Sequence, residues 1–381
     1  MRGQALKQLV ENKDIGVRGV CAKLQQLLSE GKLHPSDISV RELWESFIGP
    51  VSQTLEYSER HAGFQFLAEG ATDSTAFASI MGQVLMARAM ESYTQPAYIG
   101  DQLFDVIQTR RKTERMPGFT LQDNQGEVDE GMPYPESGMK DKYVSFESGK
   151  KRGVLLSITE EAVFLDETGM LLRRAADIGE FIRLNRETRM LDVFVGKTSN
   201  YYPDGVQTAI YAAGNGNVAT TNALQDWTDI DAVMQVVAAQ TDPEGNKILV
   251  DIRQLIVPWA LVGTAARIMN ATLLRVTTNT SNQTDSPGSS PLSPLFTGGM
   301  PSILTSPLLD GYTSPAPGTT TWFMGNGPRA FLYREHWPFQ AFRRRQDTEA
   351  AWTQDVVEQF KFREWGTAHC VDHRHMYRST A

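Results

Sequence analysis

The chain has 381 residues, 41% of them hydrophobic, and a formal net charge of -8 at pH 7. This composition is sufficient for a real core in one large domain or in two to three ordinary ones. The negative charge argues against a nucleic-acid-binding protein, which would more usually be basic. Two cysteines, Cys21 and Cys370, argue against a disulfide-stapled secreted fold. No signal peptide is apparent, and no apolar run reaches the ~20 residues of a membrane span, so we expect a soluble product with no membrane partner.

Residues 1–95 are predicted to be helical. Apolar residues recur near helical spacing in ALKQLVENKDIGVRGVCAKLQQLLSEG, and SVRELWESFIG begins with a capping box of Ser39 and Glu42. TDSTAFASIMGQVLMARAMESY is a third helical segment. Two interpretations stay open at this point: a partner-binding arm and an ordinary helical subdomain.

Residues 143–164 are predicted to form an antiparallel hairpin around a polar, lysine-bearing turn. The segment before it, LQDNQGEVDEGMPYPESG, is acidic and rich in glycine and proline, which does not suit a core. The hairpin therefore has little of its own chain to pack on. We expect it to reach away from the body of the subunit.

The longest predicted helix covers residues 168–197, with an apolar stripe and with arginines elsewhere on its surface. A second helix is expected in DWTDIDAVMQVVAAQTDPEGN, capped by Thr228 and Asp231. A strand, Pro258 and a helix follow, and residues 279–318 have the composition of a long exposed loop or insertion. Alternating residues from 321 onward predict several closing strands. The fold class is α+β, without a regular βαβ pattern.

Three short fragments imitate functional motifs. VGKTS at 195–199 lacks the first glycine of a phosphate-binding loop and ends a helix instead of opening one. SGKK at 148–151 has the spacing of a serine–lysine acylase but none of its companion motifs. RRR at 343–345 has no continuing basic surface, which argues against nucleic-acid readout. We expect no catalytic residues and no cofactor.

The fragment HCVDHRH is the best candidate for a metal site. It contains four plausible zinc ligands within seven residues, among His369, Cys370, Asp372, His373 and His375. Strand alternation would place His369, His373 and His375 on one side and the other two on the opposite side. A polar terminal strand is therefore favoured. A zinc-dependent enzyme stays as an alternative that would require bound zinc.

The order of these parts resembles the major capsid proteins of tailed bacteriophages with the Hong Kong 97-type fold. The sequence KYVSFESGKKRGVLLSITEEAVFLD resembles the extended E-loop of that family, and the helix 168–197 resembles its spine helix. RQLIVPWALVGTAARIMN resembles an A-domain segment, and the stretch from WFMGNGPRAFLYREHW to the end resembles the closing strands. The resemblance covers about residues 96–381.

The resemblance implies five parts along the chain. These are an N-terminal helical arm at 1–95, an E-loop region at 96–167, a P-domain spine helix at 168–200, an A-domain at 201–330 and closing P-domain strands at 331–381. We expect the arm to pack against the P-domain or a neighbouring subunit, chiefly through Trp44 and Phe47. The hairpin would lie across a neighbour and present the charged residues Lys142, Glu147, Lys150, Lys151 and Arg152.

The implied function is assembly of the icosahedral head shell around double-stranded DNA, with no enzymatic turnover. The partners would be copies of the chain in hexamers and pentamers, the packaged DNA contacted non-specifically, and possible scaffolding, portal and decoration proteins. The subunit would assemble in the bacterial host cytoplasm and end in the virion. No lysine–asparagine cross-link is expected, because no partner asparagine or base can be identified. An encapsulin-like nanocompartment is the alternative within the same fold.

Overall fold

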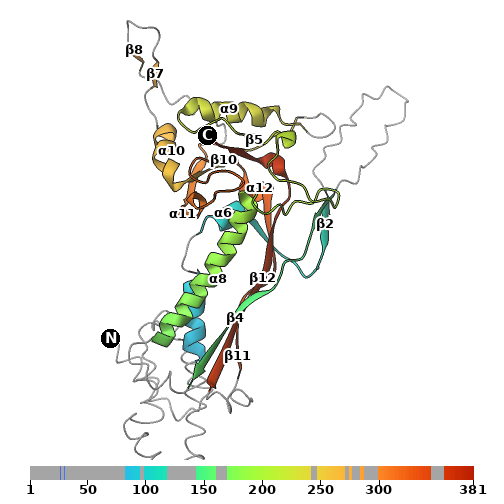
Figure 1. Cartoon of the computed structure of the whole chain (residues 1–381), viewed down its shortest axis with the longest axis vertical. Helices are drawn as coiled ribbons and strands as arrows, with labels where there is room; N and C mark the ends of the chain where they lie inside the picture. Colours follow the sequence, from blue (N-terminus) through green and yellow to red (C-terminus); the bar gives the residue numbers. More distant parts are fainter. Residues whose placement is uncertain are drawn as a thin grey trace, which may run out of the picture. The chain divides into compact units, whose positions relative to one another are not determined.

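The computed structural model describes most of the chain beyond residue 81. The described ranges are 82–94, 98–117, 143–159, 170–241, 247–270, 274–276, 284–286, 299–344 and 356–381, together with Gln26 and Glu30. The chain divides into two compact units, each built from separate stretches (Figure 1). Unit 1 comprises residues 1–97, 151–185 and 338–364, and unit 2 comprises residues 98–150, 186–337 and 365–381.

Unit 1 packs helices on one face of a sheet. Strand β4 (Arg152–Thr159) pairs antiparallel with β12 (Val356–Cys370), and β11 (Phe331–Arg344) contributes its second half. The helix over residues 82–94 lies against this sheet, where Tyr93 stacks on Phe339 with 4.5 Å between ring centroids. Phe339 in turn stacks on Phe362. Aromatic side chains therefore form the centre of this layer.

The same helix also packs against α8 (Met170–Phe194), whose first half belongs to unit 1. The two helices meet at Gly179, where a Cβ atom would collide with the backbone carbonyl of Ala89. Only glycine permits this approach, because any side chain would push the helices apart.

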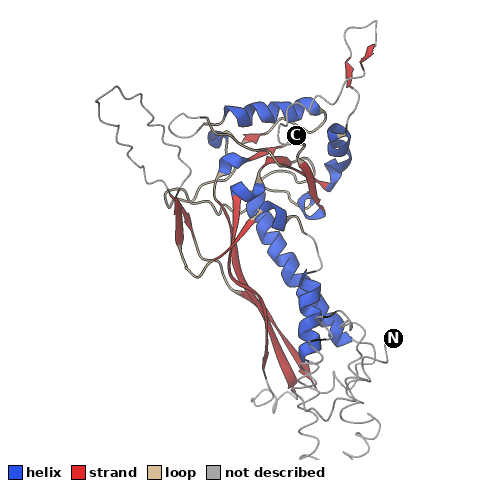
Figure 2. Cartoon of the chain, turned by 180° about the vertical axis from the view of Figure 1, so that it is seen from behind, coloured by secondary structure: helices blue, strands red, loops and turns tan. Residues whose placement is uncertain are grey.

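Unit 2 contains a five-stranded mixed sheet with the order β5-β13-β10-β6-β9. Figure 2 draws the strands of the chain in red and its helices in blue. Its strands are Val218–Ala219, Met376–Ser379, Trp322–Gly325, Gln254–Pro258 and Ser302–Ser306, in that order. Both faces are buried, so successive residues enter different cores: Phe323 joins one cluster, whereas Trp322 and Met324 join the other. Burial on both faces explains the uninterrupted apolar runs of β6 and β10.

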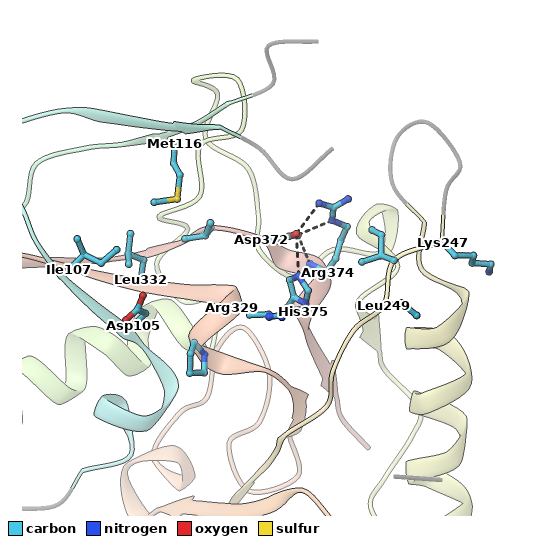
Figure 3. Close-up of a pocket in the computed structure, with 13 residues that line it drawn as sticks. Asp105, Ile107, Met116, Lys247, Leu249, Arg329, Leu332, Asp372, Arg374 and His375 are labelled. Carbon is cyan, nitrogen blue, oxygen red and sulfur yellow. Dashed lines mark hydrogen bonds and ion pairs between the residues drawn. The ribbon is translucent and has the colours of Figure 1, made fainter. Parts of the chain in front are cut away.

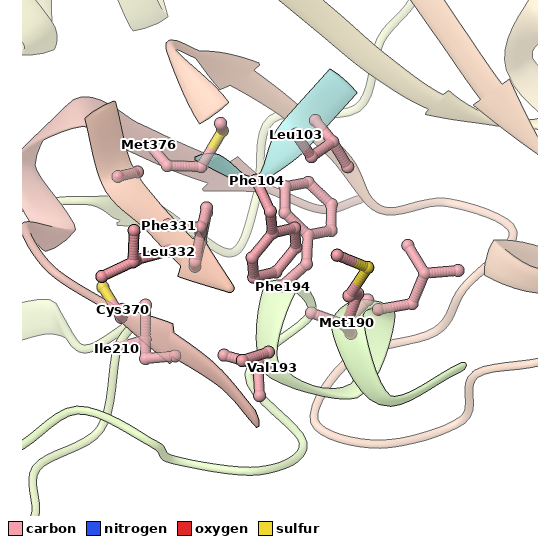
Figure 4. Packing of buried hydrophobic residues seen from close by; sticks show 14 of the residues in the cluster. Leu103, Phe104, Met190, Val193, Phe194, Ile210, Phe331, Leu332, Cys370 and Met376 are labelled. Carbon is pink, nitrogen blue, oxygen red and sulfur yellow. The ribbon is translucent and has the colours of Figure 1, made fainter. Parts of the chain in front are cut away.

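One of the two cores lies beneath α9 (Trp227–Ala239) and α10 (Val262–Met269) and includes Ile230, Val233 and Ile268. The other contains the end of α8 and the start of β11, where Phe194 contacts Phe331 (Figure 4). Phe194 also contacts Phe323. Short elements complete the unit. They are α6 (Gly100–Leu103), η3 (Ala213–Asn215), η4 (Trp259–Leu261), β7 (Leu274–Val276), β8 (Thr284–Ser286), α11 (Pro307–Asp310), α12 (Gly327–Ala330) and η5 (His373–His375).

A two-stranded ribbon belongs to unit 2. Strand β2 (Glu114–Pro117) pairs antiparallel with β3 (Tyr143–Phe146), and Pro117 lies opposite Tyr143. Residues 118–142 connect the two strands. Strand β1 (Asp105–Gln108), which precedes the ribbon, pairs in parallel with the start of β11.

The α+β class, the long helix and the closing strands are confirmed, but the predicted hairpin at 143–164 is wrong. Both strands exist, yet β3 pairs with β2, and β4 pairs with β12. Local alternation identifies a strand but not its partner, because partners are selected by contacts distant in sequence. In the sequence, the acidic segment lies between β2 and β3 of this ribbon. The prediction had placed it before the hairpin.

Two further predictions require correction. The cap of α9 is Asp226, whose side chain accepts from the Thr228 amide, while Asp229 accepts from the Asp226 amide. The predicted pair, Thr228 and Asp231, lies two residues too late. The segment 279–318 is also not wholly an exposed loop, because Leu304 on β9 and Leu309 on α11 are buried in the core.

Candidate functional site

Arg334 on β11 holds the base of the β2–β3 ribbon. Its side chain is 1% exposed and donates to the carbonyls of Arg111 (2.9 Å) and Phe146 (3.3 Å) and to the Glu114 carboxylate (3.3 Å). Because Glu114 begins β2 and Phe146 ends β3, one guanidinium ties both strands to β11. Burial lowers the pKa of Arg334, and the neighbouring carboxylate of Glu114 opposes that shift.

A second buried ion pair fixes the end of α8. Arg186 donates to Glu335 at 3.1 Å, and its guanidinium lies 4.3 Å from the centroid of the Tyr333 ring. The neighbouring Glu187 accepts the Gly100 amide with both carboxylate oxygens, at 3.0 and 3.1 Å. These contacts join α8, β11 and α6. The sequence pattern places the helix arginines off the apolar stripe, and periodicity does not reveal such a pair.

The segment from Glu147 to Lys150 is held through its backbone, so its charged side chains point outward. The His369 Nε2 atom donates to the Glu147 carbonyl at 3.0 Å, and Trp365 Nε1 donates to the Gly149 carbonyl at 2.7 Å. The Glu147 and Lys150 side chains are exposed. This arrangement presents charge from a fixed backbone, which suits recognition by another molecule more than catalysis.

The remaining predicted contact residues are only partly described. Lys151 and Arg152 are exposed in unit 1, and Arg152 donates to Asn185 at 3.5 Å. Trp44, Phe47 and Lys142 lie outside the described residues. The structure therefore describes four of the seven predicted contact residues, and all four are exposed.

Unit 2 contains a pocket of about 580 Å³ beside the ribbon (Figure 3). Its lining is largely apolar, with charged groups from several elements: Asp105, Ile107, Met116, Lys247, Ile248, Leu249, Pro328, Arg329, Leu332, Val371, Asp372, Arg374 and His375. Arg374 pairs with Asp372 at 2.8 Å. Burial alone would raise the pKa of Asp372, but the hydrogen bonds and charge of Arg374 lower it overall. Asp372 is therefore ionised, and the Arg374 guanidinium balances its charge.

The histidine-rich end of the chain does not converge on one point. Strand β12 ends at Cys370, and η5 follows, so the alternation predicted through residue 375 is wrong. His369 contacts a carbonyl, His373 Nδ1 lies 3.0 Å from the Tyr201 hydroxyl, and Cys370 is buried in the apolar core. Among the residues described, no cluster of three His, Cys, Asp or Glu side chains has the geometry to hold a metal.

Burial favours the neutral form of the histidines and of the cysteine in this segment. Burial lowers the pKa of His369 to about 4, with the positive charge of Arg334 adding to the effect. It also lowers the pKa of His373 and His375 and raises that of the Cys370 thiol. Neutral, buried groups of this kind serve packing. Nothing in their geometry favours the zinc-enzyme alternative.

Residues 145–379 match the model of a family described as phage capsid protein. None of the curated protein sequences matches the chain. Among solved structures, the chain is similar to the capsid of the cyanophage P-SCSP1u, with 10% identity, a TM-score of 0.48 and coverage of 75% of this chain and 88% of that one. It is similar to a structure from Mycobacterium phage Bobi, with 14% identity, a TM-score of 0.48 and coverage of 75% and 90%.

A virus-like particle from Pyrococcus furiosus is also similar, with 9% identity, a TM-score of 0.44 and coverage of 77% of this chain and 97% of that one. Identities and TM-scores this low carry no argument about function. The sequence match over residues 145–379 carries the family assignment.

Proposed function

This chain belongs to the phage capsid protein family, and from that premise we propose that its copies build the closed icosahedral head shell around the double-stranded DNA of a tailed phage. The family is structural, and its members are components of the virion. The match spans more than half of the chain, from β3 to β13, and therefore includes the long helix, the five-stranded sheet and the strands β4, β11 and β12. That match is the observation that carries the proposal.

The segment from Glu147 to Lys150 supports a role in assembly, because it presents charged side chains from a fixed backbone. Glu147 and Lys150 project from a segment whose backbone is hydrogen-bonded to His369 and Trp365. We propose that these residues contact neighbouring subunits, together with Lys142, Lys151, Arg152, Trp44 and Phe47. Exposed ion pairs contribute only about 0–1 kcal/mol each, but a closed lattice repeats every contact many times.

The division of labour along the chain is proposed on the same basis. Residues 1–95 would form the arm, 96–167 the E-loop region, 168–200 the spine helix, 201–330 the A-domain and 331–381 the closing strands of the P-domain. Scaffolding, portal and decoration proteins are proposed partners, DNA would be contacted non-specifically, and assembly would take place in the host cytoplasm. In the described ranges, each helix is too short or too polar to cross a lipid bilayer.

Electron microscopy of the purified full-length chain tests the proposal. The expected result is closed shells, or rings of five and six subunits that close when the protein concentration is raised. A protein that stays monomeric at high concentration, over a range of salt and pH, would contradict it. Zinc analysis of the same sample separates the shell protein from the zinc-enzyme alternative.

A further inference from the structure

The pocket beside the ribbon in unit 2 has the size and the lining of a small-molecule site. Its volume of about 580 Å³ lies within the range of such sites, roughly 300–1,000 Å³, which are mostly apolar and hold a few polar groups. Its walls come from β1, β2, residues 247–249, α12 with the start of β11, and η5 (Figure 3). All of these elements belong to one compact unit, so a single subunit forms the pocket.

The apolar part of the lining is only partly covered by the subunit itself. Leu249 is 90% exposed and Ile107 is 39% exposed, although both line the pocket. Leu332 is buried, and Met116 and Val371 are partly buried and pack against the core. An apolar occupant would therefore remove the exposed part of this lining from water, and that burial favours binding.

One cation of the lining is not used by the described part of the subunit. Arg374 is paired with Asp372, and the Lys247 ammonium donates to a carbonyl at the end of α9 at 3.3 Å. Arg329 is exposed and has no hydrogen bond or ion pair with another described residue. Figure 3 shows it beside His375. Arg329 is therefore the group available to bind an anion.

Asp105 limits where that anion would lie. Its side chain is exposed, and Figure 3 shows it near Leu332, whereas Arg329 lies near His375. The carboxylate of Asp105 repels an anion from its own side of the pocket, and Arg329 attracts one to the other side. An occupant with one negative group would place that group beside Arg329 and its apolar part along the remaining lining.

These features select among the classes of small ligand. A phosphate or a nucleotide needs several cationic groups or amide donors, and a sugar needs many hydrogen-bonding partners. The pocket offers a mostly apolar lining and, among the described residues, Arg329 as its uncommitted cation. A cationic amphiphile would be repelled by the same guanidinium. A single negative group on an aliphatic tail matches both parts of the lining.

We propose that this pocket binds an aliphatic carboxylate of the fatty-acid class. Its carboxylate lies against Arg329, and its tail covers Ile107, Met116 and Leu249. Because Ile107 is on β1 and Met116 is on β2, the bound tail also joins the base of the ribbon to residues 247–249. The inference concerns the single subunit and is independent of the proposed function.

Isothermal titration calorimetry of the purified full-length chain tests the site with octanoate, decanoate and dodecanoate, each kept below its aggregation threshold. We expect one saturable site whose Kd falls about fourfold for each added methylene until the tail fills the pocket, because each methylene leaves water. Decanol has the same tail without the charge. It should bind at least ~10-fold more weakly than decanoate, because it lacks the charge-assisted contact with Arg329.

Two substitutions of exposed side chains locate the binding in the pocket. Arg329→Gln should weaken decanoate binding at least ~10-fold and change decanol binding less than ~2-fold, because only decanoate carries the charge. Leu249→Glu should weaken decanoate binding at least ~5-fold, because it adds a carboxylate to the apolar lining. The matched controls Arg267→Gln and Val206→Glu change exposed positions outside the pocket and should stay within ~2-fold of wild type.

Two further measurements complete the test. Thermal unfolding without ligand shows whether each variant is folded, and Leu249→Ser replaces Leu249→Glu if that variant is not. Hydrogen exchange then reports on the base of the ribbon. Saturating decanoate should slow the exchange of amides in β1 and β2 at least ~3-fold in the wild-type chain, because the bound tail opposes local opening. Arg329→Gln at the same decanoate concentration should show a smaller effect.

The contrary outcomes overturn the proposal. Equal binding of decanol and decanoate would refute Arg329 as the group that holds the anion. Binding that survives both Arg329→Gln and Leu249→Glu lies elsewhere on the chain. A wild-type chain that binds no decanoate at about 1 mM has no such site. None of these results bears on shell assembly, which electron microscopy of the same sample tests separately.

Discussion

The two halves of β12 differ in what covers the same side of the strand. In unit 2, Trp365 and His369 are covered by the chain itself, through hydrogen bonds to the carbonyls of Gly149 and Glu147. In unit 1, Lys361 and Arg363 belong to a face that the described residues leave open. One alternating pattern therefore serves two purposes. Where the chain covers the strand, the side chains are aromatic or neutral, and where it does not, they are cationic.

The largest loss of stability is expected from Arg334→Ala, which would release the β2–β3 ribbon from β11 in unit 2. The substitution removes one donor from the carbonyls of Arg111 and Phe146 and from the carboxylate of Glu114, and it should lower the free energy of unfolding by about 3 kcal/mol. Urea unfolding measures this loss. The control is Arg329→Ala, an exposed arginine of the same unit, expected to cost under about 0.5 kcal/mol. Equal losses in both variants would refute the anchoring role.

The second-largest loss of stability is expected at acidic pH, through His369 in the covered half of β12. Burial lowers the pKa of His369 to about 4, so the unfolded chain binds its proton near pH 6.5 while the folded chain does not. Stability should fall as the pH drops from 6.5 to 4, by up to about 3 kcal/mol from this residue. Urea unfolding at pH 7, 5.5 and 4 measures the slope, and His369→Gln should flatten it. An unchanged slope in that variant would show that His369 is not the titrating group.

A smaller loss should follow Trp365→Phe. The substitution keeps an aromatic ring near Trp337 but removes the Nε1 donor to the Gly149 carbonyl. We expect a loss of about 1 kcal/mol in the free energy of unfolding, because one hydrogen bond is removed and most of the packing stays. Proteolysis at Lys150 and Lys151 should also become faster. Unchanged proteolysis would mean that the segment is held by other contacts.

The smallest effect on the subunit is expected from Leu155→Thr on the open half. The side chain is more than half exposed in the subunit, and threonine suits a strand, so the unfolding free energy should change by less than about 0.5 kcal/mol. Urea unfolding of the variant measures this change. A loss of more than about 1 kcal/mol would show that other parts of the chain cover Leu155.

Sequence periodicity predicted the elements whose environment is uniform along their length. The helix α8 begins and ends within three residues of its predicted limits, and β11, β12 and β13 lie where alternation placed the closing strands. Both signals come from neighbours in sequence, which the pattern records directly. The family resemblance, too, came from the order of such elements.

Pairing across long separations could not be predicted in the same way. Arg186 and Glu335 are 149 residues apart. The sequence around each of them is typical of an ordinary surface charge. The same limit explains the wrong hairpin, because β4 selected β12 from the far end of the chain and not the adjacent β3. The exposed side of the unit 1 sheet could not be predicted either, because β4, β11 and β12, which form it, are distant from one another in sequence.

The crossing of the helix over residues 82–94 with α8 has a mechanical consequence. At Gly179 the two backbones touch without an intervening layer of side chains, and Tyr93 fastens the same helix to the sheet through Phe339. A force that detaches the helix over residues 82–94 must therefore break two attachments within unit 1, the backbone contact at Gly179 and the ring stack on Phe339. The helix and the sheet are thus joined mechanically as well as by packing.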